Sequence, residues 1–301
     1  MQMNKVILFY KFVPLPDPRI TMLWQKELCE KLELKGRIII SPHGINGTLG
    51  GNIENLRKYK RAMNSSEVFR SIKYKWSDGT GDEFPKLSVK VREELVSFKK
   101  PDEVKVSEKG VEGGGKHLKP EALHKLVEEK GDDVVFFDGR NAYEAQVGKF
   151  KDAIVPATET TRDFVEEIES GKYDDIKDKP VVTYCTGGIR CEVLSVLMKN
   201  RGFKEVYQMD GGIVKYGEKY GDDGLWEGNL YIFDDRMTHK FSDKAKDIGK
   251  CVHCNGKTSN FENCADVSCN RLVLICKDCK QNQKILCKNH TKVKSLGLNR
   301  L

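Results

Sequence analysis

Residues 181–192 read Val-Val-Thr-Tyr-Cys-Thr-Gly-Gly-Ile-Arg-Cys-Glu, an apolar run that ends at a cysteine and a short glycine loop. The β-branched residues at 181–183 predict a buried strand. Apolar residues at positions 193, 194, 196 and 197 predict a helix over residues 192–201. The stretch therefore predicts a strand, a loop and a helix in succession.

The loop has the composition of an anion site that holds a thiolate. Cys185 would lie among backbone N–H groups at a helix N-terminus, where the helix dipole favours negative charge. With Arg190 close by, we expect a nucleophilic cysteine whose pKa is depressed. The backbone of the loop comes from Thr186, Gly187, Gly188 and Ile189. The alternative is an inert buried cysteine, but two glycines and an arginine favour anion binding over core packing.

The length of the loop limits its chemistry. Four residues separate Cys185 from Arg190, and such a loop encloses a pocket suited to a single sulfur. A phosphate needs a wider ring, so a cysteine phosphatase is disfavoured. Cys191 has two interpretations, a resolving thiol for Cys185 or a cysteine that packs the helix; in the second case Cys191→Ala would cost little activity.

The chain is longer than one domain of about 100–200 residues, so two or three domains are expected. No apolar run approaches the 18 or so residues of a membrane span, and the N-terminus lacks the features of a leader. Seven of the ten cysteines lie within residues 251–287 at metal-ligand spacings. These features predict a cytoplasmic protein that does not associate with membranes.

Residues 1–96 are expected to form a separate α+β domain. Strands are expected over residues 5–13, 36–40, 44–50 and 72–76, with helices over 20–34 and 53–63 and an additional strand over 86–92. The order β-α-β-β-α-β is the ferredoxin-like pattern. Residues 97–116, which contain a run of three glycines, are predicted to be a linker.

Residues 117–220 are expected to form an α/β domain around the cysteine loop. Besides the strand at 181–183 and the helix at 192–201, helices are expected over residues 118–130 and 162–170 and strands over 133–138 and 204–209. Alternating strands and helices favour a parallel sheet, with its site at the carboxyl ends of the strands.

Residues 221–301 form a basic, cysteine-rich segment. Its eight candidate metal ligands come in four pairs: Cys251 and Cys254, Cys264 and Cys269, Cys276 and Cys279, Cys287 and His290. Two C-x-x-C pairs alone would suit one tetrahedral zinc, whereas all eight ligands could fill two interleaved sites. At least one structural zinc is expected, and it could supply much of the folding free energy of so polar a segment. The alternative is a set of reduced cysteines packed as small hydrophobic residues.

Positive charge is concentrated at the C-terminal end. Residues 240–301 contain 13 Lys and Arg against 5 Asp and Glu, whereas the whole chain has a net charge of +7. The excess indicates a polyanionic partner, and RNA suits a cytoplasmic enzyme. The alternative is a solvated lysine-rich face that aids solubility.

The loop resembles that of the rhodanese domain, whose active cysteine carries a persulfide. Residues 136–144 resemble the rhodanese strand that ends in Asp-x-Arg, here Asp138 and Arg140, with a glutamate four residues after the arginine. Residues 148–154 resemble the segment Gly-His-Ile-x-Gly-Ala-x, and residues 209–213 the closing Gly-Gly turn. The chain departs from the pattern at Lys149, Asp152 and Tyr216, where His, Gly and Trp are usual. The resemblance makes Asp138 and Arg140 supporting residues of the site.

The order of the three parts, together with Asn263-Cys264-Ala265, resembles the rhodanese-domain tRNA uridine hydroxylases over nearly the whole chain. The resemblance implies tRNA as partner, molecular oxygen as co-substrate, Cys185 as the essential residue and a hydroxyl group placed on carbon 5 of the wobble uridine. The residues show no flavin, haem or nicotinamide motif and no iron-binding facial triad. A persulfide sulfurtransferase and a non-catalytic tRNA-binding protein remain as alternatives, and the oligomeric state stays open.

Overall fold

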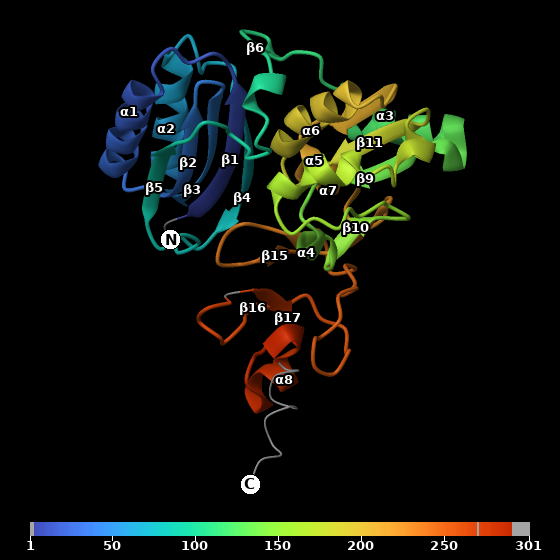
Figure 1. Ribbon diagram of the computed structural model, residues 1–301. Coiled ribbons are helices and arrows are strands. Elements are labelled where there is room, and N and C mark those ends of the chain that lie inside the picture. The colour runs from blue at the N-terminus through green and yellow to red at the C-terminus, as the bar shows by residue number, and fades with distance from the viewer. Residues whose placement is uncertain (1–2, 270, 291–301) are drawn as a thin grey trace.

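The computed structural model describes residues 3–269 and 271–290. Figure 1 shows an N-terminal sheet with its helices α1 and α2, a central α/β domain beside it and a C-terminal segment that extends away from both. The predicted fold class is confirmed, with an α+β part, a parallel α/β part and a cysteine-rich C-terminal part. Residues 291–301, the end of the expected basic segment, lie outside the described residues.

The N-terminal sheet has five strands in the order β4-β1-β3-β2-β5. Its elements are β1 (Asn4–Phe12), α1 (Pro18–Lys31), β2 (Lys35–Ser41), β3 (Gly44–Asn52), α2 (Ile53–Ser65), β4 (Lys73–Gly79) and β5 (Leu87–Val91). All pairs are antiparallel except β2 with β5, which is parallel. The β-α-β-β-α-β order is as predicted, and the additional strand joins the edge at β2.

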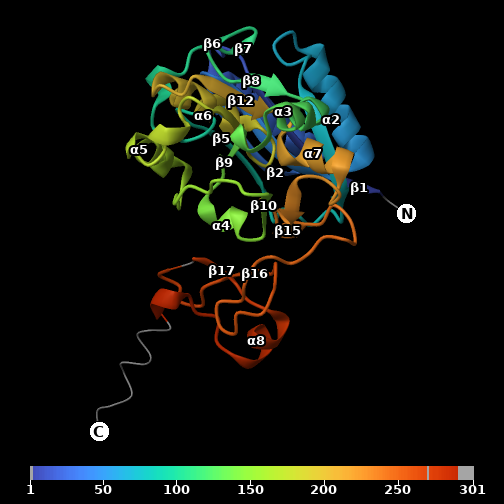
Figure 2. The same ribbon diagram turned by 90° about the vertical axis from the view of Figure 1, so that its right-hand side faces the viewer.

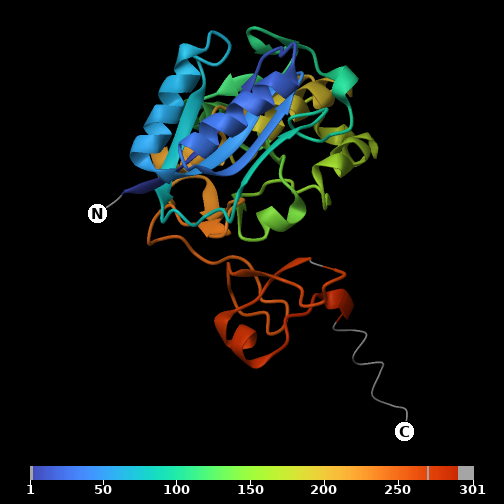
Figure 3. The same ribbon diagram turned by 90° about the vertical axis from the view of Figure 1, so that its left-hand side faces the viewer.

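Each face of this sheet has a different role. Ile7 and Phe9 alternate toward α1 and α2 and lie in the buried core beneath them. The two helices begin at side-chain caps, since Asp17 accepts from the backbone of Arg19 and Asn52 from that of Glu54. Figures 1 and 3 show both helices, in blue, on the face of the sheet away from the central domain. The opposite face is therefore left to contact the central domain.

The segment predicted as a linker is also packed. Residues 97–116 contain a hairpin of β6 (Val106–Ser107) and β7 (Gly110–Val111). Phe98 and Val104 are buried in the same hydrophobic cluster as Phe137 and other residues of the central domain. This connection therefore fixes the N-terminal sheet against the central domain.

The central sheet has four parallel strands in the order β8-β12-β11-β9. The strands are β8 (Lys116–Leu118), β9 (Val135–Asp138), β11 (Pro180–Tyr184) and β12 (Glu205–Met209), and the helices are α3 (Pro120–Lys130), α4 (Ala142–Ala145), α5 (Phe164–Glu169), α6 (Ile189–Asn200) and α7 (Gly212–Tyr220). Every residue of β11 is buried, as its apolar sequence predicts. Helices α4 and α7 were not predicted.

Helix α6 begins three residues before the predicted start. Gly188 adopts a left-handed conformation with φ 99° and precedes the first helical residue. Glycine has no Cβ to oppose this conformation, so the helix starts at Ile189. Arg190 therefore lies in the first turn of the helix instead of in the loop.

Two departures from the rhodanese pattern fit the scaffold. Asp152, where glycine is usual, has φ 55°, a left-handed conformation that Asp tolerates better than most residues. Tyr216, where tryptophan is usual, is fully buried, and its hydroxyl accepts from the backbone N–H of Leu225 at 2.6 Å. Both residues lie in the scaffold outside the cysteine loop.

The C-terminal segment begins on the central domain and then leaves it. It comprises β13 (Trp226–Gly228), β14 (Leu230–Tyr231), β15 (Thr238–His239), β16 (Phe261–Asn263), β17 (Leu272–Leu274) and α8 (Lys277–Asn282), and β13 pairs with β10 (Gly148–Phe150). Figure 2 shows β16, β17 and α8 grouped apart from the two larger sheets. Among the described residues, no helix is both long and apolar enough to cross a membrane.

Candidate functional site

The cysteine loop joins β11 to α6 at the carboxyl end of the central sheet. The backbone N–H of Gly188 donates to Cys185 Sγ at 3.2 Å. The Gly-Gly turn before α7 closes the loop, because Ile213 N–H donates to the carbonyl of Cys185 at 3.0 Å. A Cβ on Gly212 would lie only 2.5 Å from that carbonyl oxygen. Glycine at position 212 therefore lets the two segments approach.

Cys185 is poised as a thiolate. Burial by itself raises the pKa of its thiol. A hydrogen bond from the Cys191 thiol, the charge of Arg190 and backbone N–H groups outweigh burial and lower this pKa to about 5. Cys191 is itself buried on α6, and its own pKa is raised by burial and by the charge of Cys185. At neutral pH Cys185 carries the negative charge and Cys191 stays protonated.

Arg190 also contacts groups other than Cys185. Its guanidinium pairs with Glu144, with Nη1 to Oε1 at 2.5 Å and Nη2 to Oε2 at 2.8 Å, and both side chains are buried. Nη2 also donates to Thr186 Oγ1 at 3.4 Å, and the guanidinium lies 5.5 Å from the centre of the Phe233 ring. Glu144, four residues after Arg140 in the rhodanese-like segment, is therefore a site residue that was not predicted from the sequence.

The two supporting residues lie behind the loop. Arg140 is bidentate to Asp138, at 2.9 and 2.6 Å, and both are fully buried. Arg140 also donates to the carbonyl of Gly148, and Tyr184 donates to Asp138 at 2.9 Å. These contacts tie β9, β10 and β11 together, so the pair stabilises the strand that precedes Cys185. Neither residue lines the cavity at the loop.

A cavity of about 660 Å³ opens at the loop. One wall contains Cys185, Thr186, Gly187, Ile189 and Arg190; the face of the N-terminal sheet and residues just after β14 form the others. Arg37, Thr48 and Phe233 are among these outer residues. The cavity has the volume of ordinary small-molecule sites. It offers cationic, hydroxyl and aromatic groups beside a nucleophile. The proximity of these segments could not be predicted from their spacing in the sequence.

We predict that Arg190 depresses the pKa of the Cys185 thiol through its charge. Arg190→Ala should raise that pKa, and Arg190→Lys should raise it less, because lysine keeps the charge but loses the planar fork that grips Glu144. Iodoacetamide alkylation of Cys185, measured against pH, tests this. An alkylation profile of Arg190→Ala identical to that of the unchanged protein would show that Arg190 does not lower the pKa of the Cys185 thiol.

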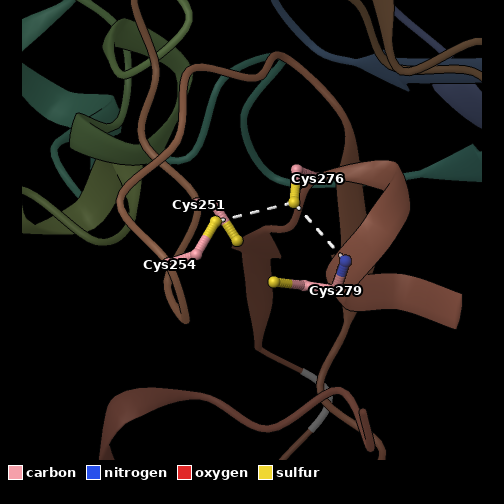
Figure 4. A group of neighbouring side chains, drawn as sticks. All are labelled: Cys251, Cys254, Cys276 and Cys279. Atoms are coloured by element: carbon pink, nitrogen blue, oxygen red, sulfur yellow. Dashed lines mark hydrogen bonds between the residues drawn. The ribbon is translucent and has the colours of Figure 1, made fainter. Parts of the chain in front are cut away.

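The eight ligand candidates gather into two groups. Cys251, Cys254, Cys276 and Cys279 form one, and Cys264, Cys269, Cys287 and His290 form the other; within each, the ligand atoms lie within 4.8 Å of one another. Figure 4 shows the four thiols of the first group converging from a loop, a strand end and the start of α8. The four pairs are therefore interleaved, the first with the third and the second with the fourth.

The spacing of these sulfur atoms suits a metal. Cys254 Sγ and Cys276 Sγ are 3.7 Å apart, and Cys269 Sγ and Cys287 Sγ 3.8 Å. A tetrahedral zinc with bonds of about 2.3 Å to sulfur has sulfur–sulfur edges of about 3.8 Å, whereas disulfide sulfurs are about 2.0 Å apart. His290 Nδ1 lies 3.3 Å from Cys264 Sγ. Each group offers four donors, the number that a closed tetrahedral zinc site needs, which fits structural and not catalytic metal.

We predict two zinc ions per chain in protein purified under reducing conditions, one in each group. Cys279→Ser should lower the content to one, because it removes a ligand from the first group only. Elemental analysis measures the content, and alkylation of Cys185 should be unaffected. Protein that contains no zinc would contradict the assignment.

Comparison with known families divides the chain into three matches. Residues 4–95 match the UPF0176 acylphosphatase like domain, residues 119–219 the rhodanese-like domain and residues 227–292 the rhodanase C-terminal family. A solved rhodanese-like domain from Anabaena sp. matches 37% of this chain and 78% of that chain, with 17% identity and a TM-score of 0.31.

Curated relatives match nearly the whole chain. The tRNA uridine(34) hydroxylase of Corynebacterium jeikeium (strain K411) is 62% identical, over 92% of this chain and 89% of the relative. The protein of the same name from Arthrobacter sp. (strain FB24) is 60% identical, over 95% of this chain and 97% of the relative. The matches thus include the N-terminal sheet, the cysteine loop and most of the cysteine-rich segment.

Proposed function

The chain belongs to the tRNA uridine(34) hydroxylase family, and on that premise we propose that it hydroxylates carbon 5 of uridine 34 in tRNA, with Cys185 as the reactive group. The observation that carries this proposal is the Cys185 thiolate at the wall of a cavity of about 660 Å³. A cavity of this volume accepts one nucleotide but not a duplex. The target base would leave its stack and enter the cavity, as bases do in other enzymes that modify them.

The residues around the cavity have separate tasks. The backbone N–H of Gly188 and the Cys191 thiol hold the negative charge of Cys185. Arg190, fixed by Glu144, supplies positive charge at the same wall. Phe233, 46% exposed, offers an aromatic face on which a base can stack. The chain's own groups thus provide a nucleophile, electrostatic support and a binding surface.

We propose molecular oxygen as the co-substrate, because the relatives are named hydroxylases. The experiment supplies purified protein with tRNA, a thiol reductant and air enriched in oxygen-18, and analyses the nucleosides by mass spectrometry. 5-Hydroxyuridine that carries the label supports the proposal. Label-free 5-hydroxyuridine would contradict oxygen as the source. In a parallel reaction supplied with thiosulfate as sulfur donor and a thiol as acceptor, transfer of sulfur without any hydroxylation of tRNA would favour the sulfurtransferase alternative.

We predict that lysines of the cysteine-rich segment bind tRNA phosphates. Lys277, Lys284 and Lys288 are exposed near the two ligand groups. Changing all three to Gln should weaken binding and reduce the slope of log K against log salt by up to about 2 to 3, since each phosphate contact contributes about 0.7–0.9. Filter binding of tRNA at several salt concentrations measures the slope.

The matched control removes three exposed charges from the outer helices, with Lys26, Lys31 and Lys58 changed to Gln. These lysines lie on α1 and α2, on the side away from the central domain. The control should keep the original slope. Equal slopes for the two triple variants would contradict a specific role for the segment.

A further inference from the structure

The free face of the N-terminal sheet is pressed against the cysteine loop. A Cβ on Gly187 would lie 2.7 Å from Leu8 Cδ2, and one on Gly188 would lie 3.0 Å from Tyr10 Oη. The Tyr10 hydroxyl also donates to Glu192 Oε1, on α6, at 3.1 Å. Because these two loop residues lack a Cβ, the N-terminal sheet can pack directly against the loop.

Lys75 makes the most direct of these contacts. It lies on β4, opposite Leu8 of β1, and its side chain crosses to the central domain. Its Nζ donates to the carbonyl oxygen of Gly187 at 2.7 Å and lies 5.0 Å from the centre of the Tyr10 ring. Lys75 is only 7% exposed, yet it lines the cavity that contains Cys185.

The ammonium of Lys75 is buried without a carboxylate partner. Among the described residues, no Asp or Glu oxygen lies within 4.0 Å of it, and a single carbonyl accepts from its three N–H groups. Burial lowers the pKa of Lys75 to about 8; the charges of Cys185 and Asp210 raise it, and those of Lys215 and Lys73 lower it. Burial of a charge is unfavourable unless an opposite charge compensates it. Cys185 and Asp210 are the two anions whose charges raise the pKa of Lys75, and Cys185 has the larger effect.

We propose that Lys75 is a positioning residue of the active site, supplied by the N-terminal domain, which holds the loop through Gly187 and stabilises the Cys185 thiolate electrostatically. The proposal deepens the proposed function, on which it rests for the identity of the reactive group. It gives the N-terminal domain a part in the chemistry, since the loop would lack this cation without β4. Removal of the charge should therefore raise the pKa of the Cys185 thiol.

The test is alkylation of Cys185 in the full-length protein as a function of pH. The thiolate sulfur forms a bond to the methylene carbon of iodoacetamide as iodide leaves, and mass spectrometry of the peptide that contains Cys185 measures the product. Lys75→Met should shift the midpoint upward by about one pH unit, the lower end of the shifts that a nearby opposite charge produces. Lys75→Arg should keep the midpoint close to that of the unchanged protein, because arginine keeps the charge.

Lys73→Met is the matched control. Lys73 lies on the same strand and face, but its side chain is 84% exposed and its Nζ is 3.8 Å from Asp210, so its removal should leave the midpoint in place. A Lys75→Met midpoint equal to that of the unchanged protein would overturn the proposal, and so would equal shifts in the two Met variants. If circular dichroism shows that Lys75→Met does not fold, Lys75→Gln, which keeps a hydrogen-bond donor, gives the same two readings.

This measurement needs no tRNA. A protein that fails to form 5-hydroxyuridine but shows the Lys75-dependent shift would refute the proposed function and leave the role of Lys75 standing. Hydroxylation with an unshifted midpoint would do the reverse.

Discussion

Replacing Cys185 with serine is expected to reduce 5-hydroxyuridine formation to background while the protein stays folded. Serine is nearly isosteric, and its oxygen can still accept from the backbone N–H of Gly188. Its hydroxyl, however, stays protonated at neutral pH, whereas the pKa of the Cys185 thiol is about 5. The measurement is mass spectrometry of nucleosides from tRNA incubated with each purified protein.

Cys29→Ala provides the control for loss of a buried cysteine. Cys29 lies on the buried face of α1, away from the cavity, so its loss should change stability but not the reaction of the folded protein. Both variants should give the far-ultraviolet circular dichroism of the unchanged protein. Substantial 5-hydroxyuridine from Cys185→Ser would contradict the assignment of the reactive group.

The second large effect is expected at Glu144. Glu144→Gln leaves the guanidinium of Arg190 buried without its counter-charge. Breaking a buried ion pair in this way should lower the free energy of unfolding by about 3 kcal/mol. The positive charge of Arg190 is then no longer shared with Glu144, so the pKa of the Cys185 thiol should fall below its value in the unchanged protein. Urea unfolding and the alkylation profile of Cys185 measure the two effects.

The opposite signs separate this variant from Arg190→Ala, which should raise the same pKa. Glu166→Gln is the control, because Glu166 is exposed on α5 and its removal should change neither quantity by a measurable amount. A Glu144→Gln protein with unchanged stability and an unchanged thiol pKa would show that the ion pair is not formed as the structure has it.

The sequence predicted the parts of the site that are local in the chain. The strand, the glycine loop and the helix at 181–192 carry their own signals, namely β-branched residues, glycines and helical spacing. The metal-ligand pairs were readable for the same reason, since each pair spans six residues or fewer. Two interleaved sites are one of the arrangements that the sequence allows, and in the structure the first pair lies with the third and the second with the fourth.

The sequence could not predict what distant segments bring to the loop. Lys75 is 112 residues from its partner Gly187, and Glu144 is 46 residues from Arg190. No periodicity or spacing encodes such contacts, because they depend on how one sheet packs against another. The start of α6 was misplaced for a different reason. The left-handed conformation of Gly188 starts the helix before the apolar pattern begins.

The central claim is that this protein uses Cys185 to hydroxylate uridine 34. Its most direct test is nucleoside mass spectrometry of position 34 in tRNA from cells that lack the protein, complemented with either the unchanged protein or Cys185→Ser. The account predicts that 5-hydroxyuridine and its derivatives at this position are depleted in the deletion, restored by the unchanged protein and not restored by the serine variant. An undiminished level in the deletion, in cells with no second hydroxylation route, or full restoration by Cys185→Ser, would contradict it.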